Sequence, residues 1–446
     1  MVQNITEQFL ESCSENFNNI PQNRLMMNAV IKVGIDEASI SNQSIIDNQF
    51  TFSNEIGTGK VANQKLSGRC WMFAGLNLLR QRIIEKYNIK DFELSQCYTM
   101  FWDKLEKSNY FLESIIDTLE KPLDSRLVMW LLSNPIQDGG QWDMFANIVE
   151  KYGVLPKYMM PETFHSSSSS KMNSLLALKL RQGALTLRKL HEGGASVESI
   201  RNEKEKILGE VYNMLCCFLG EPPKKFDFEY KDADGKFHRR ENLTPLKFYS
   251  EFVDINIRDY VSIINAPTAD KKFNTAYTVA YLGNVKGGKD IKYLNVDVDT
   301  LKELAIKQLQ DNQTVWFGCD VGKLSDQTMG IMDDALYNYD DVLGTNLELS
   351  KGERLDYGES CLTHAMVLTG VNIYDGKPNR WKVENSWGDG KGDKGYFVMS
   401  DSWFEKFTYQ IVTNKKYLPK ELSKAYEKEP QVLNPWDPMG SLAVMK

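Results

Sequence analysis

The sequence lacks the residue patterns that usually hold metals and nucleotides. Its seven cysteines include no CxxC pair and no Cys/His cluster with zinc spacing. No glycine-rich segment has the spacing of a phosphate-binding loop or of a dinucleotide-binding turn. Only four histidines are present in 446 residues. We therefore predict no metal site and no cofactor.

Long apolar runs and an excess of positive charge are also missing. No stretch approaches the roughly 18 apolar residues of a membrane span, and the beginning of the chain has neither the basic nor the apolar region of a secretion signal. With 53 basic and 60 acidic residues the net charge is −7, which implies no attraction to nucleic acid or to anionic membranes. These absences favour a cytoplasmic protein.

One cysteine stands at the start of a helical pattern. The stretch QKLSGRCWMFA covers residues 64–74, and residues 71–87 have the apolar spacing of a buried helix. Unpaired N–H groups at a helix start lower the pKa of a thiol, so Cys70 is a candidate nucleophile. Gln64 and the backbone N–H of Cys70 are candidate donors to an oxyanion. The alternative is that Cys70 is simply a small buried hydrophobe.

A cysteine nucleophile needs a histidine base, and only one histidine lies in an apolar stretch. Residues 362–371, LTHAMVLTGV, predict a core strand that contains His364. The other three, His165, His191 and His238, lie in polar segments. His364 is therefore the candidate base, although a histidine in such a strand is often only a core residue.

A third group follows in residues 383–390, VENSWGDG. We expect Asn385 to accept a hydrogen bond from Nδ1 of His364 and so to leave Nε2 facing the sulfur. Trp387 would cover that hydrogen bond from water and strengthen it. The alternative is that the segment forms only a turn.

Four segments together resemble the signatures of papain-like cysteine peptidases, in the order of that family. They are Gln64, GRCWMFA around Cys70, THAM around His364 and NSWG from Asn385. The chain has Gly-Arg-Cys-Trp where the common papain pattern has Gly-Ser-Cys-Trp. With DGGQWDM at 138–144 and the ending NPWDPMGSLAVMK, it is most similar to the bleomycin hydrolase and aminopeptidase C branch.

The resemblance implies an α+β protein with the papain-like two-lobe fold and a large, mainly helical insertion. The spacing agrees, because 294 residues separate Cys70 from His364, whereas compact members have roughly 130 to 150. We expect three units: a helical catalytic lobe (1–155), an inserted arm (156–300) and a β-rich catalytic lobe with a C-terminal tail (301–446). Within the arm, residues 171–191 and 196–219 predict a helical hairpin.

The resemblance also assigns substrate contacts. Gly139 and Gly140 correspond to glycines that pair with the main chain of the substrate, although the residues alone also fit a plain turn. Trp387 is expected beside the substrate.

The C-terminal tail is expected to return to the cleft and to present its terminal carboxylate to the amine of the substrate. This assigns a role to Leu442, Ala443 and Lys446. Related tails stop near the alanine of a Gly-x-Leu-Ala ending, whereas this chain continues for three residues, which span up to about 10 Å. The additional residues can misplace the carboxylate, they can block the cleft, or they can be trimmed after synthesis.

The function that these residues predict is acyl transfer through a thioester. The resemblance implies a cysteine aminopeptidase that acts on peptides and assembles as a homohexamer through its arm. Two alternatives stay open: a papain-like endopeptidase with the same triad, and a non-catalytic scaffold that retains the fold.

Overall fold

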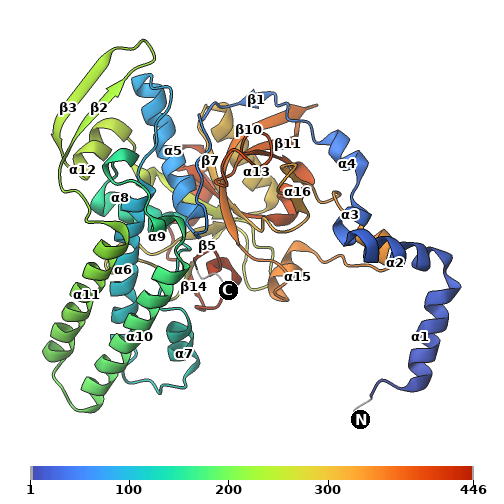
Figure 1. Cartoon of the computed structure of the whole chain (residues 1–446), viewed down its shortest axis with the longest axis horizontal. Coiled ribbons are helices and arrows are strands. Elements are labelled where there is room, and N and C mark those ends of the chain that lie inside the picture. Colours follow the sequence, from blue (N-terminus) through green and yellow to red (C-terminus); the bar gives the residue numbers. More distant parts are fainter. Residues whose placement is uncertain (1–3, 444–446) are drawn as a thin grey trace.

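Within residues 4–443, which the computed structural model describes, a twelve-stranded sheet forms the centre and two further strands form a separate hairpin (Figure 1). The order in the large sheet is β14-β5-β6-β4-β13-β7-β10-β11-β12-β9-β8, with β1 paired to β10. The strands are β1 (Asn54–Glu55), β2 (Phe226–Lys231), β3 (Phe237–Leu243), β4 (Tyr260–Ile264), β5 (Thr275–Val279), β6 (Tyr293–Asn295), β7 (Val315–Cys319), β8 (Ser325–Asp326), β9 (Ile331–Met332), β10 (His364–Tyr374), β11 (Lys377–Glu384), β12 (Tyr396–Ser400), β13 (Thr408–Asn414) and β14 (Gln431–Leu433).

Helices cover the sheet and form most of the remaining structure. None of those in the described part of the chain is both long and apolar enough to cross a membrane. The helices are α1 (Glu7–Asn19), α2 (Pro21–Val33), α3 (Ile35–Ser39), α4 (Asn42–Asp47), α5 (Cys70–Tyr87), α6 (Gln96–Ile116), α7 (Arg126–Ser133), α8 (Trp142–Tyr152), α9 (Phe164–Ser167), α10 (Ser170–Glu192), α11 (Val197–Leu219), α12 (Pro245–Phe248), α13 (Val298–Gln310), α14 (Tyr339–Leu343), α15 (Lys351–Asp356), α16 (Asp401–Phe407) and α17 (Lys420–Glu427).

Helix α5 is the buried helix that the sequence predicts, and it packs against β7 and β10. Its first turn is tied to the sheet, because the indole Nε1 of Trp316 donates to the carbonyl of Trp71 at 3.0 Å. Farther along, the buried guanidinium of Arg80 contacts Glu384 at 2.8 Å. The helix ends at Asn88, whose left-handed conformation (φ 50°) is typical of a helix C-cap. The nucleophile helix is thus fixed to the β-rich side at its first turn and near its middle.

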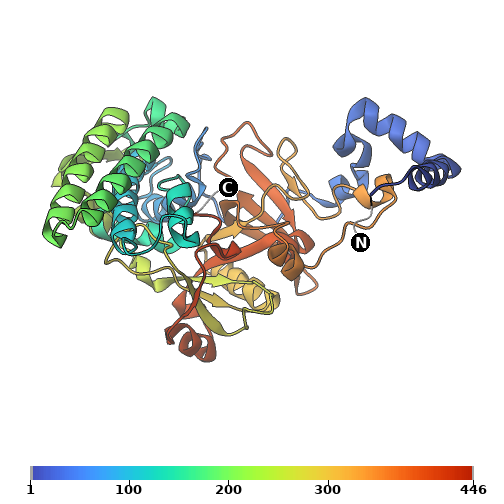
Figure 2. The same cartoon turned by 90° about the horizontal axis from the view of Figure 1, so that it is seen from below.

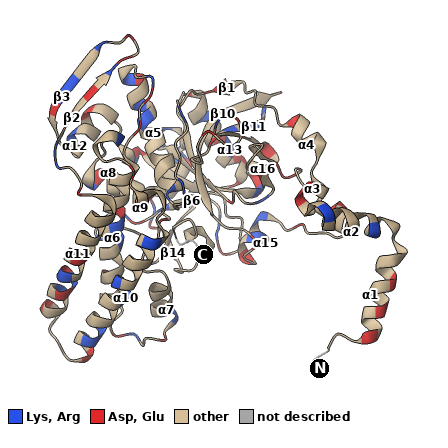
Figure 3. Cartoon of the chain, viewed as in Figure 1, with Lys and Arg blue, Asp and Glu red and all other residues tan. Residues whose placement is uncertain are grey.

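The inserted arm contains the predicted helical hairpin, formed by α10 and α11 beside α6 (Figure 1). The two helices approach closely at Gly183, where a Cβ atom would meet the side chain of Ile207 at 3.1 Å. Two cations of α11 pair with Glu113 of α6: Arg201 at 2.8 Å and Lys204 at 2.6 Å. Acidic and basic residues both lie along α11 (Figure 3). The hairpin therefore packs on the helical side of the molecule through both apolar contacts and ion pairs.

The structure departs from the predicted division at 155 and 300 in two places. Strands β4, β5 and β6 lie within 156–300 yet belong to the large sheet, where β4 pairs with β13. The first helices lie beside the β-rich side, away from α5 and α6 (Figure 2). They contact that side through the bridge between Ile40 and Tyr337 and through a hydrogen bond from Ser44 to Asp333. The true boundaries between the units depend on strand pairing and helix contacts between segments that are far apart in the sequence.

Candidate active site

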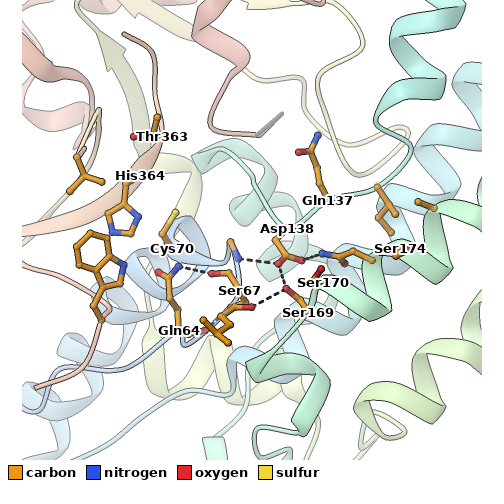
Figure 4. Close-up of a pocket in the computed structure, with 17 residues that line it drawn as sticks. Gln64, Ser67, Cys70, Gln137, Asp138, Ser169, Ser170, Ser174, Thr363 and His364 are labelled. Atoms are coloured by element: carbon orange, nitrogen blue, oxygen red, sulfur yellow. Dashed lines mark hydrogen bonds between the residues drawn. The ribbon is translucent and has the colours of Figure 1, made fainter. Parts of the chain in front are cut away.

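A cavity of about 700 Å³ lies where α5, the arm and the β-rich side meet (Figure 4). Three parts of the chain line it. The loop before α5 contributes residues from Gln64 to Cys70, and the β-rich side contributes Thr363, His364 and Trp387. The third part consists of Ile136, Gln137 and Asp138 together with Ser169, Ser170, Asn173, Ser174 and Ala177 of the arm. The predicted nucleophile, base and oxyanion donor therefore share one cavity.

Cys70 is the first residue of α5 and is 2% exposed. Burial raises the pKa of its thiol to about 11, and the backbone N–H groups of Ala365, Trp71 and Cys70 act in the opposite direction. The last two belong to the free N–H groups at the helix start, as the sequence predicts. These donors favour the thiolate, but they do not outweigh the cost of burying its charge.

Antiparallel pairing of β10 and β11 brings His364 and Asn385 together. His364 begins β10, Asn385 follows β11, and the pair Val367–Glu384 sets the register between them. Nε2 of His364 lies 2.9 Å from Oδ1 of Asn385, an oxygen that can only accept, so the proton is on Nε2. Trp387 covers the imidazole with ring centroids 4.9 Å apart.

This geometry corrects the predicted roles of the two ring nitrogens. We expected Asn385 to hold Nδ1, but the structure shows it at Nε2. Nδ1 is therefore the nitrogen that remains to exchange a proton with Cys70, whose sulfur lies next to the imidazole in the cavity (Figure 4). The predicted shielding by Trp387 agrees with the ring contact.

Burial disfavours the charged form of His364, as it disfavours the charged form of Cys70. It lowers the pKa of His364 to about 4, and the hydrogen bond to Asn385 opposes this shift. Each group alone is therefore uncharged at neutral pH. Transfer of the thiol proton to Nδ1 creates both charges together, and their attraction in a water-poor cavity offsets the desolvation of each. The ion pair thus depends on both groups being present.

The imidazole of His364 should titrate far below an ordinary histidine in a Cys70→Ala variant, because only burial and Asn385 then act on it. The expected pKa is near 4, against 6.5 for an exposed ring. NMR titration of the ring protons measures it. Because the bond to Asn385 stabilises the protonated ring, adding Asn385→Ala should lower the pKa further. Titration of His364 at 6.5 or above would contradict this account.

The amide of Gln64 is fixed at both of its atoms. Its Nε2 donates to the carbonyl of Ser67 at 2.6 Å, and its Oε1 accepts from the hydroxyl of Ser386 at 2.7 Å. The backbone of Gln64 also donates to the carbonyl of Ser386 at 2.8 Å. An amide nitrogen carries two hydrogens. One is used by Ser67, and the second is available at the cavity, where an oxyanion can accept it.

Replacing Gln64 with alanine should lower kcat by roughly 10² to 10³, the effect of losing one oxyanion donor. KM should change little, because the donor bonds the transition state more strongly than the bound substrate. Steady-state kinetics on one peptide reporter checks both values. Ser386→Ala is a useful comparison, since it frees the amide without removing it and should give a smaller loss. A Gln64→Ala enzyme with wild-type kcat would remove this residue from the mechanism.

The two glycines after Asp138 do not line the cavity. A Cβ atom on Gly139 would meet the carbonyl oxygen of Leu442 at 2.3 Å, and one on Gly140 would meet the Trp71 ring at 2.4 Å. The carbonyl of Gly139 accepts from Nζ of Lys107 at 2.5 Å. Gly139 thus contacts the tail in this structure, and pairing of either glycine with substrate remains a prediction.

The described part of the tail returns to the core beside this segment. Leu442 is fully buried and Ala443 is 5% exposed. The hydroxyl of Ser441 donates to the carbonyl of Leu362, two residues before the base, at 2.8 Å. Lys446, which we predicted to carry the terminal carboxylate, lies outside the described residues.

Sequence reasoning missed two buried ions that hold the loop before Cys70. Arg69 is fully buried, and its guanidinium binds Glu162 of the arm through bonds of 3.0 and 2.7 Å. Asp138 accepts the backbone N–H of Gly68 at 2.9 Å. A signal for the first was present, since Arg69 replaces the serine of the common papain pattern. For Asp138 nothing in the sequence indicated this role, because its only notable feature is that two glycines follow it.

Comparison with known proteins places this site in a family. Residues 4–440 match the model of the family described as "Peptidase C1-like family". The chain belongs to this family. The resemblance found in the sequence to papain-like cysteine peptidases is thereby confirmed.

Relatives of this peptidase C1-like chain match it along its whole length. Aminopeptidase C of Listeria monocytogenes is 52% identical over 440 residues, which cover 99% of each chain. Aminopeptidase C of Lactococcus lactis subsp. lactis is 49% identical and covers 98% of this chain and 100% of its own. The crystal structure of PepW from Lactobacillus rhamnosis HN001 superimposes with a TM-score of 0.97 at 53% identity, over 99% of both chains. The predicted papain-like α+β fold is confirmed.

Proposed function

We propose that this protein is a cysteine aminopeptidase that removes N-terminal residues from peptides through a thioester intermediate. The observation that carries the proposal is the placement of Cys70 and His364 in one cavity, with Asn385 on the second ring nitrogen. Gln64 supplies an oxyanion donor at the same place. Relatives named Aminopeptidase C support release of end residues over internal cleavage.

The reaction begins when the thiol proton of Cys70 passes to Nδ1 of His364 and the sulfur attacks the peptide carbonyl. The oxyanion accepts hydrogen bonds from the Gln64 amide and from the backbone N–H of Cys70. His364 then gives its proton to the departing amine, which leaves a thioester on Cys70. The neutral imidazole next takes a proton from water, which attacks the thioester and releases the acid. Asn385 holds the ring orientation in every step.

Recognition of the free amine is the step that makes such an enzyme an aminopeptidase. In our proposal the terminal carboxylate of the tail pairs with the substrate ammonium, with Lys446 as its last residue. The burial of Leu442 and Ala443 beside Gly139 supports this role, because Gly139 directly follows Asp138, which lines the cavity. Intact mass spectrometry of the purified protein tests whether residues beyond Ala443 are retained.

A pair of fluorogenic dipeptide amides, one with a free amine and one acetylated, tests the proposed specificity. We expect rapid hydrolysis of the free-amine reporter and little of the acetylated one. Equal hydrolysis of both would favour the papain-like endopeptidase alternative. No hydrolysis of either, together with no labelling of Cys70 by an epoxide thiol inhibitor, would favour the non-catalytic scaffold.

We further propose that the protein acts in the cytoplasm as a homohexamer. Helices α1 and α2 contain no buried residue, and several of their apolar side chains are exposed, among them Leu25 at 65% and Ile31 at 78%. Exposed apolar side chains on projecting helices suit a surface between subunits. Light scattering coupled to size-exclusion chromatography tests the assembly. A monomer at micromolar concentration would contradict it.

A further inference from the structure

One peptide unit in the loop before Cys70 is held from both of its ends. This unit joins Ser67 to Gly68. Its carbonyl accepts from Nε2 of Gln64 at 2.6 Å, and its N–H donates to Oδ2 of Asp138 at 2.9 Å (Figure 4). Because the peptide unit is planar, the two bonds cannot be set independently. The orientation of the Gln64 amide is therefore linked to the position of Asp138.

Asp138 is itself fixed by donors from two other elements. Lys104 of α6 contacts Oδ1 at 2.7 Å, and Nδ2 of Asn173 donates to the same oxygen at 2.8 Å. The hydroxyl of Ser169 donates to Oδ2, the oxygen that also accepts from Gly68. Asp138 is 7% exposed and Lys104 is fully buried. Every described contact of this carboxylate is thus a hydrogen-bond donor, and two of these donors come from the arm.

The charge of Lys104 keeps the Asp138 carboxylate ionised. Burial raises the pKa of Asp138, but the positive charge of Lys104 and the hydrogen bonds from Lys104, Ser169 and the backbone of Gly68 bring it well below its usual range. The carboxylate is therefore ionised at neutral pH and accepts at both oxygens. A protonated carboxyl group would carry an O–H that can repel the N–H of Gly68, and the ionised carboxylate has no such hydrogen.

The arm also pairs with the same loop through its backbone. The N–H of Leu66 donates to the carbonyl of Ser167 at 3.0 Å, and the N–H of Ser169 donates back to Leu66 at 3.3 Å. Ser169 thus contacts the loop through its backbone and Asp138 through its side chain. The residues at the beginning of α10 therefore contact the loop that carries the oxyanion donor Gln64.

We propose that Asp138 is a positioning residue that sets the oxyanion donor Gln64 through the Ser67–Gly68 peptide unit, with the arm holding Asp138 in place. The inference rests on the proposed peptidase function and gives the arm a part in catalysis. Asp138 touches no reacting atom in this account. Its loss should let the peptide unit turn and the Gln64 amide drift from the oxyanion, which lowers kcat with little change in KM.

A double-mutant cycle between Asp138 and Gln64 tests the proposal. Removing the carboxylate alone would leave Lys104 buried without its counterion, so Asp138→Ala is always combined with Lys104→Met, and this paired change is compared with the wild type, in which the ion pair is intact. Relative to the wild type, the paired change should lower kcat roughly 10- to 100-fold, a part of the full effect of one oxyanion donor. Gln64→Ala, which costs roughly 10² to 10³ in the wild type, should cost less than about 10-fold once Asp138 and Lys104 are replaced together.

Two further variants separate positioning from a merely structural role. Asp138→Asn combined with Lys104→Met keeps one oxygen that can accept from Gly68, so it should recover most of the kcat that Asp138→Ala with Lys104→Met loses. Asp143→Asn is the matched control, because Asp143, which lies in α8 and does not line the cavity, is also a buried carboxylate that accepts a backbone N–H, that of Lys292. It should retain both the wild-type kcat and the full cost of Gln64→Ala.

The outcomes distinguish this inference from the function on which it rests. If the wild-type enzyme hydrolyses neither reporter, the proposed function fails. If it is active and Gln64→Ala costs the same factor with and without Asp138, only the positioning role is overturned. Should the Asp138→Ala protein fail to fold by circular dichroism, Ser169→Ala with Asn173→Ala takes its place. In that protein the Gln64→Ala factor must fall at least threefold, and an unchanged factor overturns the proposal.

Discussion

Replacing Cys70 with alanine is expected to remove peptide hydrolysis while leaving the folded structure intact. Without the sulfur no thioester forms, and loss of the nucleophile in a comparable triad costs roughly 10⁶ in kcat. The cost in stability should stay near 1 kcal/mol, because the change removes one buried atom and leaves backbone hydrogen bonds in place. Kinetics with the free-amine reporter and urea denaturation followed by circular dichroism measure the two quantities.

The matched control for this variant is Cys97→Ala. Cys97 is also fully buried in a helix, but it lies in α6, where its thiol faces the carbonyl of Leu219 at 3.6 Å. Its replacement should cost similar stability and leave kcat within a few-fold of wild type. An epoxide thiol inhibitor should label the wild type and Cys97→Ala but not Cys70→Ala. Residual turnover above about 1% in a Cys70→Ala preparation free of other peptidases would exclude Cys70 as the nucleophile.

Local patterns in the sequence pointed to two residues that line the cavity. Cys70 stands where a loop gives way to a buried helical pattern, and His364 is the one histidine in an apolar strand pattern. The structure shows both at the expected ends of α5 and β10. The choice of ring nitrogen was wrong, because it depends on the rotation of the His364 side chain. Residue spacing carries no information about that rotation.

The parts that could not be predicted depend on contacts between distant segments. Strands β4 to β6 look like isolated short strands in the sequence, and only their pairing with β13 shows that they extend the large sheet. The role of Asp138 depends on Lys104, Ser169 and Gly68 meeting around one carboxylate. Each of these residues is unremarkable in its own segment. Such a cluster becomes visible only when the arm and the loop are placed together.

Removing residues 442–446 should turn the aminopeptidase into an endopeptidase. Truncating one partner of a buried charge pair commonly costs 2 to 5 kcal/mol, so kcat/KM for the free-amine reporter should fall by roughly 10² to 10³. The acetylated reporter and longer peptides should be cut faster than by the wild type, because in our proposal it is the tail that closes the cleft beyond the substrate amine. The ratio of the two kcat/KM values measures the change.

A shorter truncation provides the control for that experiment, because it moves the terminal carboxylate without removing it. Deleting residues 444–446 makes Ala443 the last residue, and the backbone of Leu442 beside Gly139 is then retained. Ser441 also keeps its bond to Leu362, so the tail stays anchored next to the base. This variant keeps a terminal carboxylate on an anchored tail, so it should lose less of the preference for the free amine than the longer deletion does. If both truncated proteins keep the wild-type preference for the free amine, another group must bind the substrate ammonium, and the tail only completes the core.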